Sequence, residues 1–281
     1  MFKLLVFLIL SFPLLSWAEV LEDTVYEVVP SQNGQDAFIK LMSGRVVFFK
    51  ESDRDWAKTL DIKDQRVQIE IDDNLTIQSL QNLPQEEVPL DEAEFEEQFT
   101  ETTKMVPTVI PSWNQAMTIW NGMNRSYKSN SECSDRAHVW AWEEWKKHNL
   151  YSMKTFLFFT NTYIRAYRYK WWFHVSPSAY VYEYGKNVEH IFDRRYASIP
   201  RHMKEWTDIF IQSRKSCPET TYRNYRNNNN GKEHCYVVRA DMYYRLPLHV
   251  RNLEDSGIRK TQFSTSEVNF SYRAFTRKPS L

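Results

Sequence analysis

Glycine is scarce in this sequence, and its distribution excludes two large classes of nucleotide-binding protein. The six glycines stand at positions 34, 44, 122, 185, 231 and 257, so no two are closer than ten residues. Walker loops and G-x-G-x-x-G turns need clustered glycines, because there the backbone must approach a phosphate closely. The formal net charge is zero, since 36 basic side chains balance 36 acidic ones. Taken whole, the chain therefore lacks the basic profile of a nucleic-acid binder.

No apolar run in the sequence reaches the roughly 20 residues that a membrane-spanning helix needs. The run Leu4–Leu15 follows Lys3 and precedes Ser16-Trp17-Ala18. A short charged region, an apolar stretch and a small-x-small site are typical of a secretory signal. We expect cleavage after Ala18, which removes residues 1–18 and leaves a secreted or periplasmic protein free of the membrane. An uncleaved membrane anchor is the alternative.

Cysteines are few and odd in number. Export implies an oxidising compartment in which paired cysteines are bridged. Cys217 and Cys235 flank an Asn- and Arg-rich loop and form the predicted disulfide, which leaves Cys133 as the unpaired thiol. The histidines and cysteines lack the short paired spacings of metal sites, so we predict no metal and no cofactor.

The zero net charge hides two oppositely charged halves. Residues 1–103 carry 8 basic and 21 acidic side chains, whereas residues 104–281 carry 28 and 15. Residues 19–83 contain short runs of β-branched and aromatic residues separated by turns, which predicts a small β-rich module. Its expected strands are Tyr26–Val29, Ala37–Leu41, Arg45–Phe49 and Arg66–Ile71. Residues 84–110 are predicted to be an acidic linker, and residues 111–281 a second domain.

The pattern of the second domain predicts an α+β fold, with helices first and non-repeating strands after them. Helices are expected after the capping box at Ser112, after Glu132, and after Pro200 with Met203, Trp206 and Phe210 facing inward. The expected strands are Thr155–Phe159, Tyr163–Tyr169, Ala179–Tyr184, Val188–Phe192, Tyr236–Tyr244 and Val268–Phe275. Ser176-Pro177 is expected to interrupt a central strand, because proline cannot donate to a ladder.

Cys133 is the strongest candidate for chemistry in the sequence. It falls in the first turn of a predicted helix, where free N–H groups and the helix dipole favour a thiolate. We therefore expect its pKa to lie below the usual value of about 8.5. The same N–H groups can receive an oxyanion. The alternative is an inert cysteine packed as a small hydrophobe.

A cysteine nucleophile needs a base and a residue that orients the base. His174 ends an aromatic run on a predicted strand, and Asp193 closes the next hydrophobic strand, where it could hold the imidazole. The alternative for His174 is a structural histidine. The other six histidines fit the role less well by their local context: His138, His148, His190, His202, His234 and His249.

Five short motifs resemble those of the bacterial protein-glutamine glutaminases. They are Cys133–His138 (C-x-x-R-A-H), Trp172–Val175, Ile191–Asp193, Trp206 with Cys217, and Met242–Arg245. The resemblance covers roughly residues 113–275. It implies a fold like that of cysteine proteases and transglutaminases, in which a nucleophile helix packs on an antiparallel sheet. It also implies deamidation of protein glutamine to glutamate through Cys133, His174 and Asp193, by way of a thioester.

The same resemblance implies protein or peptide substrates with an accessible glutamine. Trp171, Trp172 and Tyr180 are then candidates for the glutamine pocket, with core positions as the alternative. Precursors in that family carry a pro-region, so residues 19 to about 110 are expected to block a basic active-site face. An ordinary accessory domain is the alternative. Two other functions stay open: a cysteine protease or acyltransferase with the same triad, and a non-catalytic exported binding protein with an inert Cys133.

Overall fold

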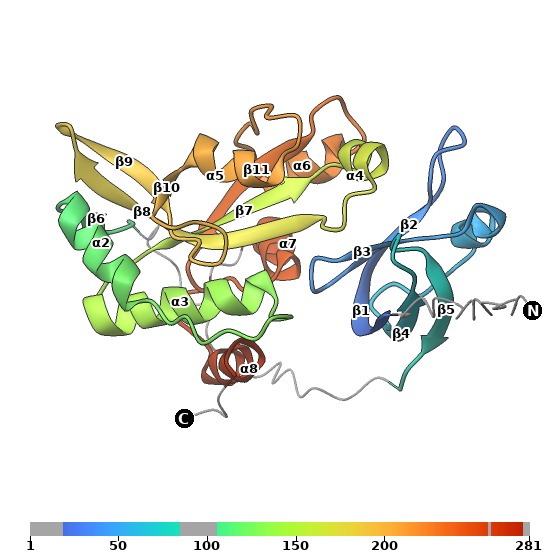
Figure 1. Ribbon diagram of the computed structural model, residues 1–281, viewed down its shortest axis with the longest axis horizontal. Coiled ribbons are helices and arrows are strands. Elements are labelled where there is room, and N and C mark those ends of the chain that lie inside the picture. Colours follow the sequence, from blue (N-terminus) through green and yellow to red (C-terminus); the bar gives the residue numbers. More distant parts are fainter. Residues whose placement is uncertain (1–18, 85–105, 258–259, 278–281) are drawn as a thin grey trace, which may run out of the picture.

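The computed structural model describes residues 19–84, 106–257 and 260–277. The predicted signal, residues 1–18, and most of the predicted acidic linker lie outside the described residues. The described chain contains two β-sheets, and its α-helices belong to the second one (Figure 1). None of the helices in these ranges is long and apolar enough to cross a membrane.

The N-terminal sheet has five antiparallel strands in the order β3-β2-β1-β4-β5. Its elements are β1 (Glu19–Val29), β2 (Phe38–Leu41), β3 (Val46–Phe48), η1 (Glu51–Asp53), η2 (Trp56–Lys58), β4 (Arg66–Ile71) and β5 (Ile77–Asn82). Strand β4 alternates buried Val67, Ile69 and Ile71 with more exposed polar residues, as a strand with one buried face requires. The sequence pattern predicted four of these strands and missed β5.

The second domain is built on a six-stranded sheet with the order β10-β9-β8-β7-β11, and β6 pairs in parallel with β8. Its first elements are β6 (Val109–Ile110), α2 (Trp113–Gly122), α3 (Cys133–His148), β7 (Met153–Phe159), α4 (Asn161–Tyr167) and β8 (Phe173–Glu183). Then follow β9 (Lys186–Ile191), β10 (Arg201–His202), α5 (Met203–Phe210), α6 (Tyr222–Asn228), β11 (Cys235–Asp241), α7 (Pro247–Ser256) and α8 (Thr265–Phe275).

Helix α3 packs against β8 and β7 and is itself backed by α8 (Figure 1). Every residue of β7 is buried, because this strand lies between β8 and β11 and is covered on both faces. The predicted α+β fold, with a β-rich module before a helix that packs on an antiparallel sheet, is confirmed.

The strand predicted at Tyr163–Tyr169 is wrong, because this segment forms helix α4. The hydroxyl of Thr160 caps the helix by accepting the amide of Tyr163 at 3.2 Å. Tyr163, Ile164 and Tyr167 share one helical face, and the first two are buried. The tyrosine-rich composition favoured a strand, but spacing and cap chemistry decide the local structure.

The strand predicted at Val268–Phe275 is also wrong, since residues 265–275 form helix α8. Val268, Ser271 and Phe275 are its buried residues, at a spacing of three and four. The ring of Phe275 meets the ring of Trp140 of α3 edge-on at 5.8 Å. Helical periodicity was therefore present in the sequence.

Pro177 does not interrupt its strand. β8 continues from residue 173 to residue 183, and Pro177 pairs with Lys154 of β7. Its carbonyl oxygen accepts the amide of Phe192 at 2.8 Å, so the strand keeps the one backbone hydrogen bond that proline can still make.

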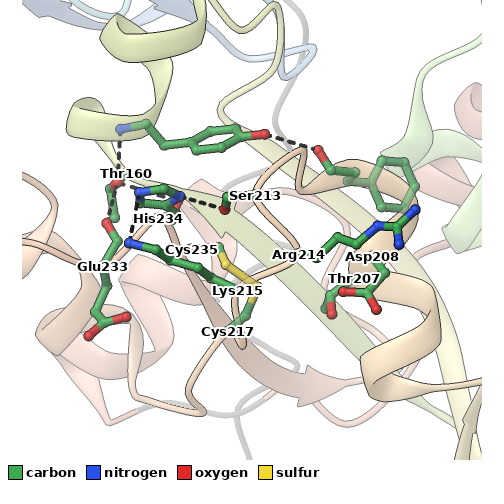
Figure 2. The surroundings of a disulfide bond; sticks show 12 residues. Thr160, Thr207, Asp208, Ser213, Arg214, Lys215, Cys217, Glu233, His234 and Cys235 are labelled. Carbon is green, nitrogen blue, oxygen red and sulfur yellow. Dashed lines mark hydrogen bonds between the residues drawn. A yellow bond between two sulfur atoms is a disulfide. The ribbon is translucent and has the colours of Figure 1, made fainter.

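Cys217 and Cys235 form a disulfide, as their spacing predicted (Figure 2). The bond joins the loop after α5 to the first residue of β11. His234 lies next to it and is hydrogen-bonded through Nδ1 to the hydroxyl of Ser213 at 2.8 Å. His234 thus belongs to the surroundings of the disulfide.

Candidate active site

Cys133 is the first residue of α3, as the sequence predicted, and it is the free cysteine of the chain. Its thiol is buried, with 2% of the residue exposed. Among the described residues no side-chain hydrogen bond caps this helix end, which leaves its first N–H groups without that usual acceptor. Cys133, the candidate nucleophile, therefore lies at a helix N-terminus, as the sequence predicted.

The predicted lowering of the Cys133 pKa is wrong for this structure. Burial raises the pKa of the thiol to about 12. The Arg136 guanidinium and a hydrogen bond from the Val175 amide favour the thiolate, whereas the charges of Glu132 and Asp193 oppose it. Removal from water thus outweighs the helix end and the nearby cation.

The Val175 amide places the cysteine beside the predicted base, because Val175 directly follows His174 on β8. The ladder between β8 and β9 begins only at Ser178, so this earlier edge of β8 has no β9 partner. There the sulfur of Cys133 accepts a hydrogen bond from the Val175 amide. The start of helix α3, at Cys133, therefore lies against strand β8 next to His174.

His174 and Asp193 form a buried pair. The Nε2 atom of His174 lies 2.6 Å from Oδ2 of Asp193, and the indole N–H of Trp206 donates to the same oxygen at 2.9 Å. Burial opposes ionisation of Asp193, but its hydrogen bonds and the positive partners keep its pKa below the usual value. An ionised Asp193 accepts a proton donor, so the neutral imidazole carries its proton on Nε2 and its lone pair on Nδ1.

Three aromatic rings enclose the imidazole of His174. Phe210 lies at 4.3 Å and Trp206 at 5.7 Å between ring centroids, and Tyr196 meets the imidazole edge-on at 5.1 Å. The sequence predicted Trp206 and Phe210 as inward residues of a helix, with Trp206 also part of a family motif, and it gave no signal for Tyr196. Together these rings fix the plane of the imidazole.

A turn of the N-terminal sheet packs directly beside this cluster. Gly44 has φ +96°, and its carbonyl oxygen accepts the amide of Trp172 at 2.9 Å. A Cβ atom at Gly44 would lie 3.1 Å from Cε1 and 3.3 Å from the carbonyl oxygen of Phe173, the residue before His174. Only glycine allows so close an approach in this conformation.

The same turn lies near the start of the nucleophile helix. Asp23 accepts the amide of Ser43 at 3.3 Å, and its charge acts with that of Asp135 on Glu132. Burial is the main cause that raises the pKa of Glu132, and these two carboxylates add to it. Met42 packs on the hydrophobic cluster that contains Cys133. The N-terminal module therefore lies near Glu132, the residue before the cysteine, and packs on the cluster to which Cys133 belongs.

The three residues predicted for the glutamine pocket have different surroundings. Trp172 is fully buried, its ring stacks on Tyr26 at 4.4 Å, and its indole N–H donates to the carbonyl of Leu41 at 2.6 Å. Trp171 is half-buried and forms a β-bridge with Arg45. Tyr180 lies about 20 Å further along β8 than His174. The structure brings the two tryptophans close to His174 and leaves Tyr180 apart.

His138 and His249 belong to a separate buried cluster of charges between α3, α7 and α8. Both lie near Glu267, at 3.8 Å and 3.6 Å. The Nδ1 atom of His138 contacts the Nζ atom of the buried Lys154 at 2.5 Å. The sequence gave no sign of this cluster, because its members come from four distant elements. Neither histidine is part of the site around Cys133.

A protein-family model matches the segment that contains these residues. The model of a family described as glutaminase matches residues 108–210, a range that includes Cys133, His174, Asp193 and Trp206. The family resemblance predicted from the motifs is confirmed. Comparison with curated proteins finds no match.

Solved protein-glutaminase structures are also similar to this chain. The crystal structure of a pro-protein-glutaminase is 14% identical, covers 91% of this chain and 93% of its own, and has a TM-score of 0.49. The NMR structure of protein-glutaminase from Chryseobacterium proteolyticum is 13% identical, covers 60% of this chain and 88% of its own, and has a TM-score of 0.39.

Proposed function

We propose that this chain is an exported protein-glutamine deamidase that uses Cys133, His174 and Asp193. The observation that carries the proposal is the buried pair of His174 and Asp193 beside Cys133, inside the segment that matches the glutaminase family. A nucleophile at a helix N-terminus, a base and a carboxylate that orients the base are the parts that acyl transfer needs.

Each residue has one role in the proposed reaction. The Cys133 thiolate attacks the carboxamide carbon of a glutamine side chain, and the N–H groups at the start of α3 receive the oxyanion. His174 takes the thiol proton of Cys133 when the thiolate forms, and the resulting imidazolium gives a proton to the departing amide nitrogen. Ammonia leaves, and a thioester remains. The neutral imidazole then activates water, which hydrolyses the thioester to glutamate and restores the thiol. Asp193 stabilises the imidazolium that forms in each half of the reaction.

We also propose that the described form is held inactive by its N-terminal module. A thiol with a pKa of about 12 holds on the order of one thiolate in 10⁵ molecules at pH 7. Burial is the largest cause of that pKa. Met42 of the module packs on the hydrophobic cluster that contains Cys133, and the turn at Gly44 packs on Phe173. Loss of the module would expose the thiol to water. The helix N-terminus and Arg136, which favour the thiolate, would then lower the pKa of Cys133.

Ammonia release from a glutamine-rich protein tests the function. A protease site placed within residues 85–105 of the full chain allows the same protein to be measured before and after cutting. We expect ammonia, no new chain ends in the substrate, and at least a tenfold rise in rate on cutting. New chain ends would favour the protease hypothesis instead.

Two controls separate the function from its regulation. Cys133→Ala should abolish ammonia release in both the cut and the uncut form while leaving the circular dichroism unchanged. Equal activity before and after cutting would refute inhibition by the module and leave the deamidase proposal intact. Absence of ammonia from the cut wild-type chain would refute the deamidase proposal itself.

A further inference from the structure

A cluster of two histidines and one carboxylate lies outside the candidate active site, at the β10 edge of the large sheet. Glu183 of β8, His190 of β9 and His202 of β10 bring one ligand atom each to within 4.8 Å of the others. They come from three neighbouring strands (Figure 1). We propose that these three side chains bind a divalent metal ion, with Zn²⁺ as the best fit.

Strand pairing aligns the two imidazoles before any ion arrives. His190 and His202 are direct partners in the antiparallel ladder between β9 and β10. Side chains of such partners stand on the same face of a sheet. Their ring centroids are 4.4 Å apart, and the ring of Trp113 packs on His190 at 5.1 Å. The backbone and Trp113 therefore hold His190, the buried member, in place.

The carboxylate completes a set of distances suited to a small cation. Oε1 of Glu183 lies 2.9 Å from Nε2 of His190 and 4.0 Å from Nε2 of His202. Ligand atoms around tetrahedral zinc are about 3.4 Å apart, given bonds of about 2.1 Å. Small side-chain rotations of Glu183 and His202 would bring the distances between the three ligand atoms to this value. Two histidines and one glutamate are a known donor set for zinc, which prefers nitrogen and carboxylate ligands in this geometry.

Binding of the ion would replace the hydrogen bond between His190 and Glu183, and the imidazole of His190 would keep its single proton. In the metal-free chain Nε2 of His190 is hydrogen-bonded to Glu183. When the ion takes the lone pair of Nε2, the imidazole carries its proton on Nδ1, which has no hydrogen-bond partner among the described residues. His202 is 47% exposed at its side chain, so an ion can enter from solvent.

The position of this cluster gives the ion a structural role. β9 leads directly to Asp193, and His202 is the N-cap residue of α5, the helix that carries Trp206 and Phe210. An ion held by Glu183, His190 and His202 would tie β8, β9 and the start of α5 together. Within the described part of the chain, the ion-pair and ring contacts of these three residues do not include Cys133 or His174, so the ion would act on the structure and not on the reacting atoms. The proposal does not depend on the deamidase activity.

The test is a Zn²⁺ titration of the full chain after chelator treatment, followed by calorimetry and thermal unfolding. We expect one tight site per chain and a midpoint of unfolding that rises with Zn²⁺ concentration. His202→Ala should weaken binding at least tenfold and remove the midpoint rise. Glu183→Gln should also weaken binding, because it removes the negative charge. The matched control is His148→Ala, which removes an exposed histidine far along α3 and should bind as the wild type does.

Co²⁺ supplies a second measurement that does not depend on stability. Visible absorption bands of tetrahedral Co²⁺ should appear at one equivalent in the wild type and be lost in His202→Ala. Circular dichroism of the metal-free variants checks that they fold. Absence of stoichiometric binding would overturn the proposal, and so would equal binding by His202→Ala and His148→Ala, since the ion would then lie elsewhere.

Discussion

The carbonyl oxygen of Gly44 accepts the amide of Trp172 at 2.9 Å, which joins a turn of the N-terminal sheet to the strand segment just before His174. A second hydrogen bond, from the Val46 amide to the carbonyl of Lys170 at 2.9 Å, lies beside it. The module is therefore attached by backbone contacts as well as by side chains, at a place next to the proposed base.

Gly44→Val should activate the uncut chain. The new Cβ would lie 3.1 Å from the Phe173 ring and 3.3 Å from its carbonyl oxygen, and the backbone conformation at φ +96° is unfavourable for valine. Both effects push the turn away from β8. We expect a several-fold higher rate of ammonia release than in the uncut wild type.

Gly34→Val is the matched control for that prediction. Gly34 also has a positive φ, of +76°, but a Cβ atom there meets nothing within 4 Å. It therefore tests backbone strain in the module without the contact to Phe173. If Gly34→Val activates the chain as strongly as Gly44→Val, the steric explanation is wrong.

The rate at which Cys133 is alkylated should depend on whether the N-terminal module is attached. The pKa of about 12 lies far above neutral pH, so the thiolate fraction of the uncut chain grows tenfold for each pH unit through pH 10. Alkylation of the uncut chain should rise over that whole range, whereas the cut chain should react faster and reach a plateau at lower pH. Mass spectrometry of the labelled peptide measures both rates, and identical pH profiles would contradict the prediction.

Trp206→Phe should lower kcat of the cut enzyme about tenfold, since it removes a hydrogen bond to a charged group that is worth about 1.5–3 kcal/mol. The indole N–H helps to hold the pKa of Asp193 low, so its loss raises that pKa. The acid side of the pH–rate profile should therefore move to higher pH. Trp120→Phe is the control, because that buried indole donates to the carbonyl of Ser198 at 3.1 Å instead.

Replacing Cys217 and Cys235 together by serine should reduce the free energy of unfolding by about 3 kcal/mol, the value expected for a loop of this size. The bond spans 18 residues and fixes the first residue of β11. Urea unfolding measures the change. Reducing agent should destabilise the wild type by a similar amount and leave the double variant unaffected; a wild type insensitive to reduction would argue against a structural role.

The sequence predicted those parts of the fold and the site that depend on local signals. The start of α3 at Cys133 follows from the residues before it, and the disulfide from the spacing of Cys217 and Cys235. The helix after Pro200 was predicted with Trp206 and Phe210 facing inward, and both are buried. The positions of His174 and Asp193 on adjacent strands were expected, and the pair is in contact.

Long-range effects could not be predicted in the same way. The pKa of Cys133 depends on its burial, and Cys133 belongs to a hydrophobic cluster whose members come from both sheets, which no local pattern encodes. The cluster of Glu183, His190 and His202 was missed for a similar reason. Its spacing along the chain is irregular, and only the register of β9 and β10 brings the two histidines together.

The stacking of Trp172 on Tyr26 has a consequence for the folding and solubility of the chain. Release of the module would remove Tyr26 and Leu41 from an indole that is now fully buried. An aromatic side chain of this size contributes roughly 150–250 Å² of contact area, and exposed patches of that kind promote association. If the module is removed as proposed, the free second domain should therefore be more prone to association than the intact chain, because the attached module keeps this indole out of water.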